Sequence, residues 1–260
     1  METGRSESKK RVILKLGTTT LTKGTKSISR GKIEDVARQI KSLSDEYEFI
    51  IVSSGAIAAA KQFVQLNGQS EITDKQALAS IGQPHLMRIF YEIFNELGLP
   101  TAQCLLTYFD FDNNESRKNI QHTINQLLKN NYVPIINEND TVATEEIKFG
   151  DNDKLAALTA SLMDADLLIM ATNTYGLYDA DPNVNPNAKT ITQIDNLDDI
   201  KSFVGVTKSE LGSGGMKSKI EAAEIATKAG IETWLIFGFA DEFLLDAMSA
   251  KVPLTKIKPK

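Results

Sequence analysis

The chain has 260 residues, of which 42% are apolar and 24% charged, and its formal net charge is −5 at pH 7. These values are typical of a folded globular protein and exclude a disordered chain, a collagen and a disulfide scaffold. The acidic balance argues against bulk attraction to nucleic acid or to an anionic membrane, because there is no basic excess to release counterions from phosphates.

The N-terminal segment, residues 1–10, is polar and predicts a flexible tail. The apolar stretch behind it, Val12–Leu16, is too short for the core of a signal peptide. No apolar run approaches the ~20 residues that cross a bilayer. The single cysteine, Cys104, lies in an apolar run and predicts a buried thiol rather than a disulfide. We therefore expect a cytoplasmic protein.

Short runs rich in Val, Ile and Leu recur along the chain and predict strands. Most are continuously apolar rather than alternating, which is typical of strands covered on both faces of a mainly parallel sheet. The predicted strands are Val12–Leu16, Phe49–Val52, Cys104–Leu106, Val133–Ile136, Leu167–Met170 and Trp234–Phe237.

Between these strands, apolar residues recur at helical spacing. The first predicted helix ends near Leu43 and has Ser27 or Ser29 as its N-cap. Pro84 is expected at the start of the next helix, where proline is well tolerated. The predicted helices cover Ile33–Leu43, Leu86–Leu97, Ile120–Leu128, Leu155–Leu162 and Ile220–Ala229. This alternation predicts an α/β fold with an open, mainly parallel sheet sandwiched between helices.

Two stretches stand out by composition near the C-terminal end. Pro182–Pro186, after the fifth predicted strand, indicates either a lobe boundary or a surface loop. The final residues, Lys251–Lys260, carry four lysines and two prolines and predict a solvated tail.

In open α/β sheets, ligands bind beyond the carboxyl ends of the strands. Lys15 stands near such an end and is followed by Gly17 and three threonines. A buried ammonium group needs a carboxylate or a phosphate beside it. The glycine and the hydroxyl groups favour a phosphate over the alternative, a lysine that reaches solvent at the sheet edge.

A second candidate anion site, Gly212–Lys219, opens the last predicted helix. Its glycines expose backbone N–H groups, and the helix N-terminus adds partial positive charge. The run fits neither G-x-x-x-x-G-K-[ST] nor G-x-G-x-x-G, so the two common nucleotide fingerprints do not apply. The alternative is a plain glycine-rich loop with solvated lysines.

Carboxylates and amides gather in Asn137–Asp140 and Asp151–Asp153. A helix N-cap explains only one of these residues. The set could hold an amino group, a magnesium ion or both, and the alternative is a hydrophilic hairpin. His85 and His122 fall in predicted helices away from the strand ends and are assigned no chemistry. A carboxylate acceptor, which is already ionised at neutral pH, needs no such base.

Five segments, in this order, resemble the glutamate 5-kinases of the amino acid kinase superfamily. They are Val12–Thr18, Val52–Ala58, Pro134–Thr144, Phe149–Asp153 and Gly214–Lys219, and the resemblance extends from Val12 to about Gly238. It implies an enzyme that transfers the γ-phosphoryl group of ATP to the side-chain carboxylate of L-glutamate. The product would be L-glutamyl 5-phosphate, in the first step of proline biosynthesis, and Mg²⁺ would accompany ATP.

The resemblance also implies roles for individual residues, carried over position by position. Lys15 and Lys219 would contact the transferred phosphoryl group, and Asp153 would orient them. The glutamate-binding positions are Ser54, Gly55, Asp140 and Asn152. The ATP-binding positions are Lys15, Thr172, Asn173, Ser213, Gly214, Gly215, Met216, Lys217, Ser218 and Lys219. No residue is assigned to a metal. Asn173 departs from the aspartate common in the family, which removes a charge near the nucleotide.

The resemblance implies a single amino acid kinase domain over residues 11–260. Its substrate-binding lobe would span about 11–165 and its nucleotide-binding lobe about 166–250, without the C-terminal PUA domain of many members. A homo-oligomer (dimer or tetramer) and feedback inhibition by proline are further expectations, with no nucleic-acid or membrane partner. Two alternatives stay open: another carboxylate or carbamate kinase of the superfamily, and a non-catalytic amino-acid or nucleotide sensor on the same fold.

Overall fold

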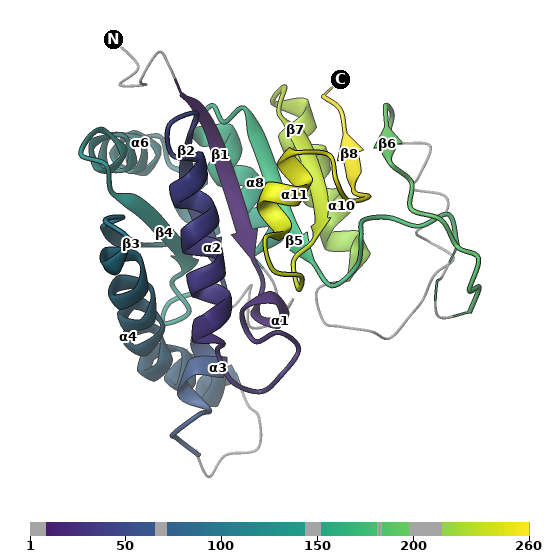
Figure 1. Ribbon diagram of the computed structural model, residues 1–260. Coiled ribbons are helices and arrows are strands. Elements are labelled where there is room, and N and C mark those ends of the chain that lie inside the picture. Colours follow the sequence, from purple (N-terminus) through teal and green to yellow (C-terminus); the bar gives the residue numbers. More distant parts are fainter. Residues whose placement is uncertain are drawn as a thin grey trace.

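The computed structural model describes residues 9–65, 72–143, 152–180, 182, 184–197 and 215–259. Within these ranges, one sheet of eight strands has the order β3-β4-β2-β1-β5-β7-β8-β6 (Figure 1). The strands are β1 Lys10–Leu16, β2 Tyr47–Ser53, β3 Thr101–Leu106, β4 Val133–Glu138, β5 Leu167–Thr172, β6 Gln193–Ile194, β7 Glu232–Phe237 and β8 Thr255–Ile257. Neighbouring strands are parallel, except that β7 and β8 are antiparallel. The predicted α/β class with a mainly parallel sheet is confirmed.

Helices cover both faces of this sheet. They are α1 Thr18–Leu21, α2 Arg30–Leu43, α3 Ala56–Ala60, α4 Ile72–Glu96, α5 Tyr108–Asp112, α6 Asn114–Lys129, α8 Asp153–Leu162, α10 Met216–Lys228 and α11 Phe243–Met248. Val12 and Leu14 of β1 belong to the core under α2, α4 and α11, whereas Ile13 belongs to the core under α6, α8 and α10 (Figure 1). Because successive strand residues point to opposite faces, a strand buried on both sides is apolar throughout.

The six predicted strands are all present, and two further strands, β6 and β8, were missed. The prediction of a solvated tail over Lys251–Lys260 is wrong for its middle part. There, β8 pairs with β7, and Leu254, Thr255 and Ile257 are buried. A three-residue strand is too short to give a recognisable pattern, so only its pairing with β7 reveals it. At the other end, β1 begins at Lys10, inside the predicted tail, whose residues 1–8 lie outside the described ranges.

Pro84 does not start a helix, contrary to the prediction, but lies inside α4. A proline in a helix interior removes one backbone hydrogen bond and usually ends the helix. Here tertiary packing holds the half of α4 that precedes it. Gly82 lies so close to α3 that any side chain on it would collide with the carbonyl group of Ala56. Sequence spacing alone carries no information on this contact.

Several smaller features of the sequence can be located in the structure. Ser29 caps α2, because its hydroxyl accepts a hydrogen bond from the Lys32 N–H group at 3.2 Å. Cys104 is partly buried against the core, and this burial raises the pKa of its thiol. In the Pro182–Pro186 stretch, Val184 is 80% exposed, as in a surface loop. His85 and His122 lie in α4 and α6. None of the helices within the described ranges is both long enough and apolar enough to span a bilayer.

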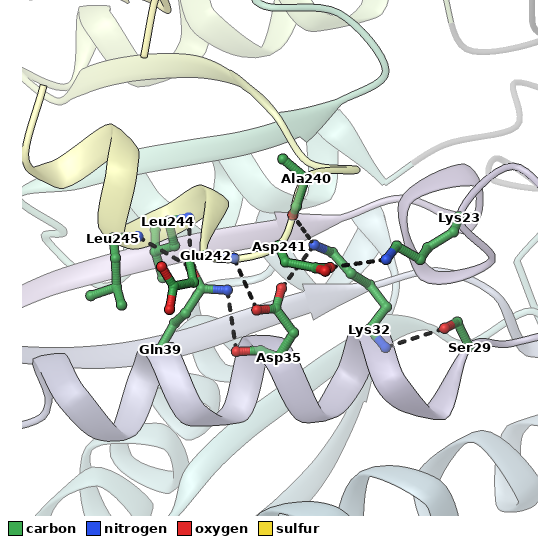
Figure 2. Close-up of polar contacts among 10 residues, drawn as sticks. All are labelled: Lys23, Ser29, Lys32, Asp35, Gln39, Ala240, Asp241, Glu242, Leu244 and Leu245. Carbon is green, nitrogen blue, oxygen red and sulfur yellow. Dashed lines mark hydrogen bonds and ion pairs between the residues drawn. The ribbon is translucent and has the colours of Figure 1, made fainter. Parts of the chain in front are cut away.

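A buried polar network fastens α2 to the segment between β7 and α11 (Figure 2). The ammonium group of Lys32, which is fully buried, donates to the Asp35 carboxylate at 2.9 Å and to the Ala240 carbonyl at 2.5 Å. It also lies 4.3 Å from the centre of the Phe243 ring. Burial lowers the pKa of Lys32, and the contact with Asp35 opposes that effect. These partners allow a charged side chain to remain inside the protein.

Gln39 supplies the second half of this network (Figure 2). Its side-chain oxygen accepts hydrogen bonds from the N–H groups of Leu244 at 2.7 Å and Leu245 at 3.1 Å. These groups lie in the first turn of α11, where no intrahelical acceptor exists. A residue of α2 therefore caps α11, and it fixes the chain that leaves β7.

We expect Gln39→Leu to lower the free energy of unfolding by about 1–3 kcal/mol, because the buried N–H group of Leu244 and the partly buried N–H group of Leu245 lose their acceptor. Urea unfolding followed by circular dichroism measures this change. Gln126→Leu, at an exposed site on α6, is the matched control and should shift stability by less than about 0.5 kcal/mol. Equal stabilities of the two variants would contradict a capping role for Gln39.

Candidate active site

The candidate site lies where the order of the strands reverses. From β1, the sheet continues through β2 on one side and β5 on the other. In open α/β sheets, this reversal leaves a crevice beyond the carboxyl ends of the strands. The N-termini of α8 and α10 lie at the same place, because Asp153 in α8 contacts both Lys15 of β1 and Lys219 of α10.

One buried carboxylate joins the two lysines that were predicted to contact phosphate. Asp153 Oδ1 lies 2.5 Å from Lys15 Nζ, and Asp153 Oδ2 lies 3.0 Å from Lys219 Nζ. The Ser218 hydroxyl also donates to Asp153 Oδ2, at 2.9 Å. Two ammonium groups thus converge on one carboxylate, an arrangement suited to binding the charged oxygens of a phosphate. The lysines predicted from separate segments therefore share one centre.

The strand pattern explains why Lys15 points to this centre. Ile13 belongs to the core under α8 and α10, and Lys15, two residues later, faces the same side. Lys15 and Asp153 are almost fully buried, whereas Lys219 retains partial exposure. Burial alone would raise the pKa of Asp153, but the ammonium groups of Lys15 and Lys219 outweigh it and lower that pKa to about 2. Asp153 is therefore ionised at neutral pH.

Beside this centre lie three buried side chains with unpaired polar atoms. Within the described residues, no hydrogen-bond partner is present for Ser54 Oγ, Asp140 Oδ1 or Asn152 Oδ1. These are three of the four predicted glutamate-binding residues. Buried polar atoms are nearly always paired, so such a cluster indicates the place of a ligand.

The orientation of Asn152 is set by its neighbours. Its amide nitrogen donates to the Ser53 carbonyl at 2.8 Å and to Asn137 Oδ1 at 2.7 Å. Both donors are therefore used, and only the acceptor oxygen is left for a ligand. Asn152 occupies the N-cap position of α8 but forms no capping hydrogen bond, so the capping interpretation does not explain it.

Asp140 lies at the edge of a small pocket of about 190 Å³ between α4 and the ends of β3 and β4. Burial raises the pKa of Asp140 to about 6. A carboxylate that is costly to ionise, and whose Oδ1 lacks a partner among the described residues, is suited to a cationic ligand such as an ammonium group.

Two glutamines of α4 support this pocket and were missed from the sequence. Gln76 donates to the Asp140 carbonyl at 2.9 Å, and Gln83 accepts from the Asn137 amide at 2.8 Å. Gln83 also lines the pocket. Gln83 and its partner Asn137 are 54 residues apart in the chain, so no local sequence pattern could have revealed this contact.

The remaining predicted residues are distributed as follows. Gly55 has a φ of 106° and opens α3 next to Ser54. Thr172 ends β5, and Asn173 is exposed just beyond it. Gly215 and Met216 begin α10, whereas Ser213 and Gly214 lie outside the described ranges. Lys217 is 85% exposed, with its ammonium group 3.8 Å from Glu221, so it does not join Lys15 and Lys219.

Known proteins resemble this chain over most of its length. A family model described as "Amino acid kinase family" matches residues 10–237. A glutamate 5-kinase from Shewanella oneidensis is 46% identical over 232 residues, which are 88% of this chain and 62% of that protein. A glutamate 5-kinase from Vibrio campbellii is 40% identical over 251 residues, which are 95% of this chain and 66% of that protein. The chain thus spans 62–66% of the length of these relatives.

Two solved structures share the fold at low sequence identity. A carbamate kinase from Giardia lamblia bound to AMP-PNP has a TM-score of 0.66 at 15% identity and covers 96% of this chain and 99% of its own. A UMP kinase from Ureaplasma parvum has a TM-score of 0.62 at 19% identity, with the same coverage of both chains. They support the fold alone.

Asp140→Asn should stabilise the protein at pH 8 and leave its stability unchanged below about pH 4. The folded-state pKa of about 6 exceeds the ordinary value of 3.8, so stability of the native protein falls as the pH rises through this window. The variant escapes this loss and should gain about 1–3 kcal/mol at pH 8.

Urea unfolding at both pH values measures the difference. Asp112→Asn, at an exposed site, is the control, with an expected change below about 0.5 kcal/mol at either pH. If Asp140→Asn raised the free energy of unfolding equally at pH 4 and pH 8, the raised pKa of Asp140 would be contradicted.

Proposed function

The chain belongs to the amino acid kinase family, and from this we propose that it transfers the γ-phosphoryl group of ATP to the side-chain carboxylate of L-glutamate. The products are L-glutamyl 5-phosphate and ADP. One observation carries the proposal: Lys15 and Lys219 converge on Asp153, and Asn152, which directly precedes Asp153, has like Ser54 and Asp140 a buried polar atom without a partner among the described residues. The similarity to glutamate 5-kinases supports glutamate as the acceptor.

The polar atoms of the cluster match an amino acid. The ammonium group of glutamate binds the acceptor oxygens of Asp140 and Asn152, and the Ser54 hydroxyl donates to a carboxylate. The unpaired state of these atoms among the described residues supports this assignment. Proline carries the same two charged groups, so the cluster also supports its proposed binding as a feedback inhibitor.

Phosphoryl transfer in this site needs positioning and charge neutralisation rather than a base. A glutamate side chain is already ionised at neutral pH, so one of its carboxylate oxygens attacks the γ-phosphorus directly. The bond from the γ-phosphorus to the bridging oxygen breaks, ADP leaves, and no proton is transferred. Lys15 and Lys219 neutralise the charge on the transferred group. Asp153 holds both lysines and, with its pKa of about 2, stays ionised throughout.

ATP is proposed to bind along Thr172, Asn173 and the start of α10, with Ser213 and Gly214 as further contacts outside the described ranges. The described residues offer no group of three His, Cys, Asp or Glu side chains that could hold a metal ion. Both oxygens of Asp153 are already paired with lysines. We propose that Mg²⁺ enters bound to the phosphates of ATP, since the described residues supply no carboxylate cluster to hold it.

Wider proposals follow from the same family. They are a single kinase domain over residues 11–260, with lobes at about 11–165 and 166–250, a cytoplasmic location, a homo-oligomeric state and a place at the first step of proline biosynthesis. The names of the relatives support the last of these.

An acceptor panel tests the function. We expect ADP release with L-glutamate, and at least about 100-fold lower kcat/KM with N-acetylglutamate, aspartate or carbamate, because each changes the ammonium group or the reach of the carboxylate. The KM for glutamate should rise as the pH falls below about 6, where Asp140 becomes protonated. If another acceptor turned over faster, it would replace glutamate as the proposed acceptor substrate. Binding of ATP and glutamate without turnover would favour a sensor.

Lys15→Ala and Lys219→Ala should each lower kcat by at least about 100-fold, because the charge on the transferred group loses a counter-charge. A coupled ADP-release assay measures the rates, and the melting temperature checks the fold. Lys228→Ala is the matched control, since this exposed lysine lies at the other end of α10 and pairs only with Glu224 among the described residues. Wild-type rates in either active-site variant would rule out the mechanism.

A further inference from the structure

The loop that follows β5, residues 173–177, contacts the start of β8, a strand that the sequence analysis did not predict (Figure 1). Thr255, the first residue of β8, is fully buried. Its hydroxyl accepts a hydrogen bond from the Leu177 N–H group at 2.8 Å and donates to the Ile191 carbonyl at 2.6 Å. This single hydroxyl thus ties the chain after β5 to the chain that enters β6.

The contact reaches Thr172, the proposed nucleotide residue, through a short series of hydrogen bonds. Gly176 has a φ of 118°, and any side chain on it would collide with the hydroxyl of Thr255. The Thr174 hydroxyl donates to the Gly176 carbonyl at 2.9 Å, and the Thr172 hydroxyl donates to the Thr174 carbonyl at 2.6 Å. Hydrogen bonds thus link Thr172 to Thr174 and Thr174 to Gly176, and the next residue, Leu177, is held by the Thr255 hydroxyl.

The same loop is held on its other side by β7. The ring of Tyr175 stacks on Phe237, with 4.6 Å between the ring centres. The N–H group of Gly238 donates to the Thr172 carbonyl at 2.8 Å. Contacts from β7 and from β8 together leave the loop little freedom, although Tyr175 and Asn173 are exposed.

We infer that Thr255 is a positioning residue for nucleotide binding. Its hydroxyl holds the 172–177 loop in the conformation that presents Thr172 and Asn173 to ATP. The inference rests on the proposed function, because only that function assigns the loop to ATP. The hydroxyl, and not the bulk of the side chain, performs this role, since both hydrogen bonds use Oγ1.

Thr255→Val tests the inference, because it keeps the shape of the side chain and removes both hydrogen bonds. We expect the Kd for AMP-PNP, measured by calorimetry, and the KM for ATP to rise about tenfold, equivalent to about 1.4 kcal/mol. The KM for glutamate should change less than about twofold. Thr255→Ser, which retains the hydroxyl, should restore most of the affinity for nucleotide. Should the valine variant not fold, Thr255→Ala carries the same expectation.

Thr233→Val is the matched control. Thr233 lies on the neighbouring strand β7, is equally buried, and its hydroxyl has no hydrogen-bond partner in the part of the chain that the structure describes. This variant should bind AMP-PNP like the wild type. Unchanged nucleotide affinity in Thr255→Val, or an equal rise in the KM for glutamate, would overturn the positioning role.

The two proposals fail separately. A wild-type chain that binds AMP-PNP without phosphorylating glutamate would contradict the proposed reaction, and a weaker Kd in Thr255→Val would still support the positioning role. If the wild type phosphorylates glutamate and Thr255→Val binds AMP-PNP with unchanged affinity, the reaction is supported and the positioning role is contradicted. A wild-type chain that binds no adenine nucleotide would overturn both.

Discussion

The ion pairs of Asp153 with Lys15 and Lys219 are the constraint on which the rest of the structure depends. A buried and a partly buried ammonium group cannot lie side by side without a shared counter-charge, and a buried carboxylate alone is also costly. The three residues come from β1, α8 and α10, so these elements must converge at one point. The position of β1 between β2 and β5, with α8 and α10 on one face, satisfies this requirement.

The two aspartates of the site show how local surroundings direct one side chain to two roles. Burial raises the pKa of Asp140 to about 6. Asp153 is buried more deeply, yet its two lysines lower its pKa to about 2. One carboxylate is thus paired inside the protein, whereas Oδ1 of the other has no hydrogen-bond partner among the described residues. The two ends of the site thus differ in chemistry, which is compatible with the phosphate donor and the amino-acid acceptor proposed above.

Rigid surroundings keep these groups in place. Asn137 and Ser53 orient Asn152, Gln76 and Gln83 extend that support to α4, and Gln39 and Lys32 hold the chain that leaves β7. In each case, a side chain from one element satisfies a buried polar group of another. Such contacts set orientation, and a change of orientation in a phosphoryl-transfer site costs rate even where the fold survives.

Local patterns were sufficient for much of this protein. Continuous apolar runs identified six strands, because strands buried on both faces must be apolar throughout. Polar residues at their carboxyl ends identified the candidate site, because parallel strands bring those ends to one edge. The same reasoning failed for β8 and for Pro84, and it gave no indication of the buried Lys32. A short strand, a helical proline and a buried charge are each tolerated only through distant partners: β7 for β8, α3 for the first half of α4, and Ala240 and Phe243 for Lys32.

By itself, then, the sequence determined the class of fold and singled out the candidate site residues, since periodicity, residue type and short motifs are local properties. Only the tertiary structure decided that Lys15 and Lys219 share Asp153, that Lys217 faces solvent and that Thr255 supports the loop after β5. Those outcomes depend on contacts between residues far apart in the chain. The free energy of such contacts comes from burial and hydrogen bonding in the folded state, which no spacing along the sequence records.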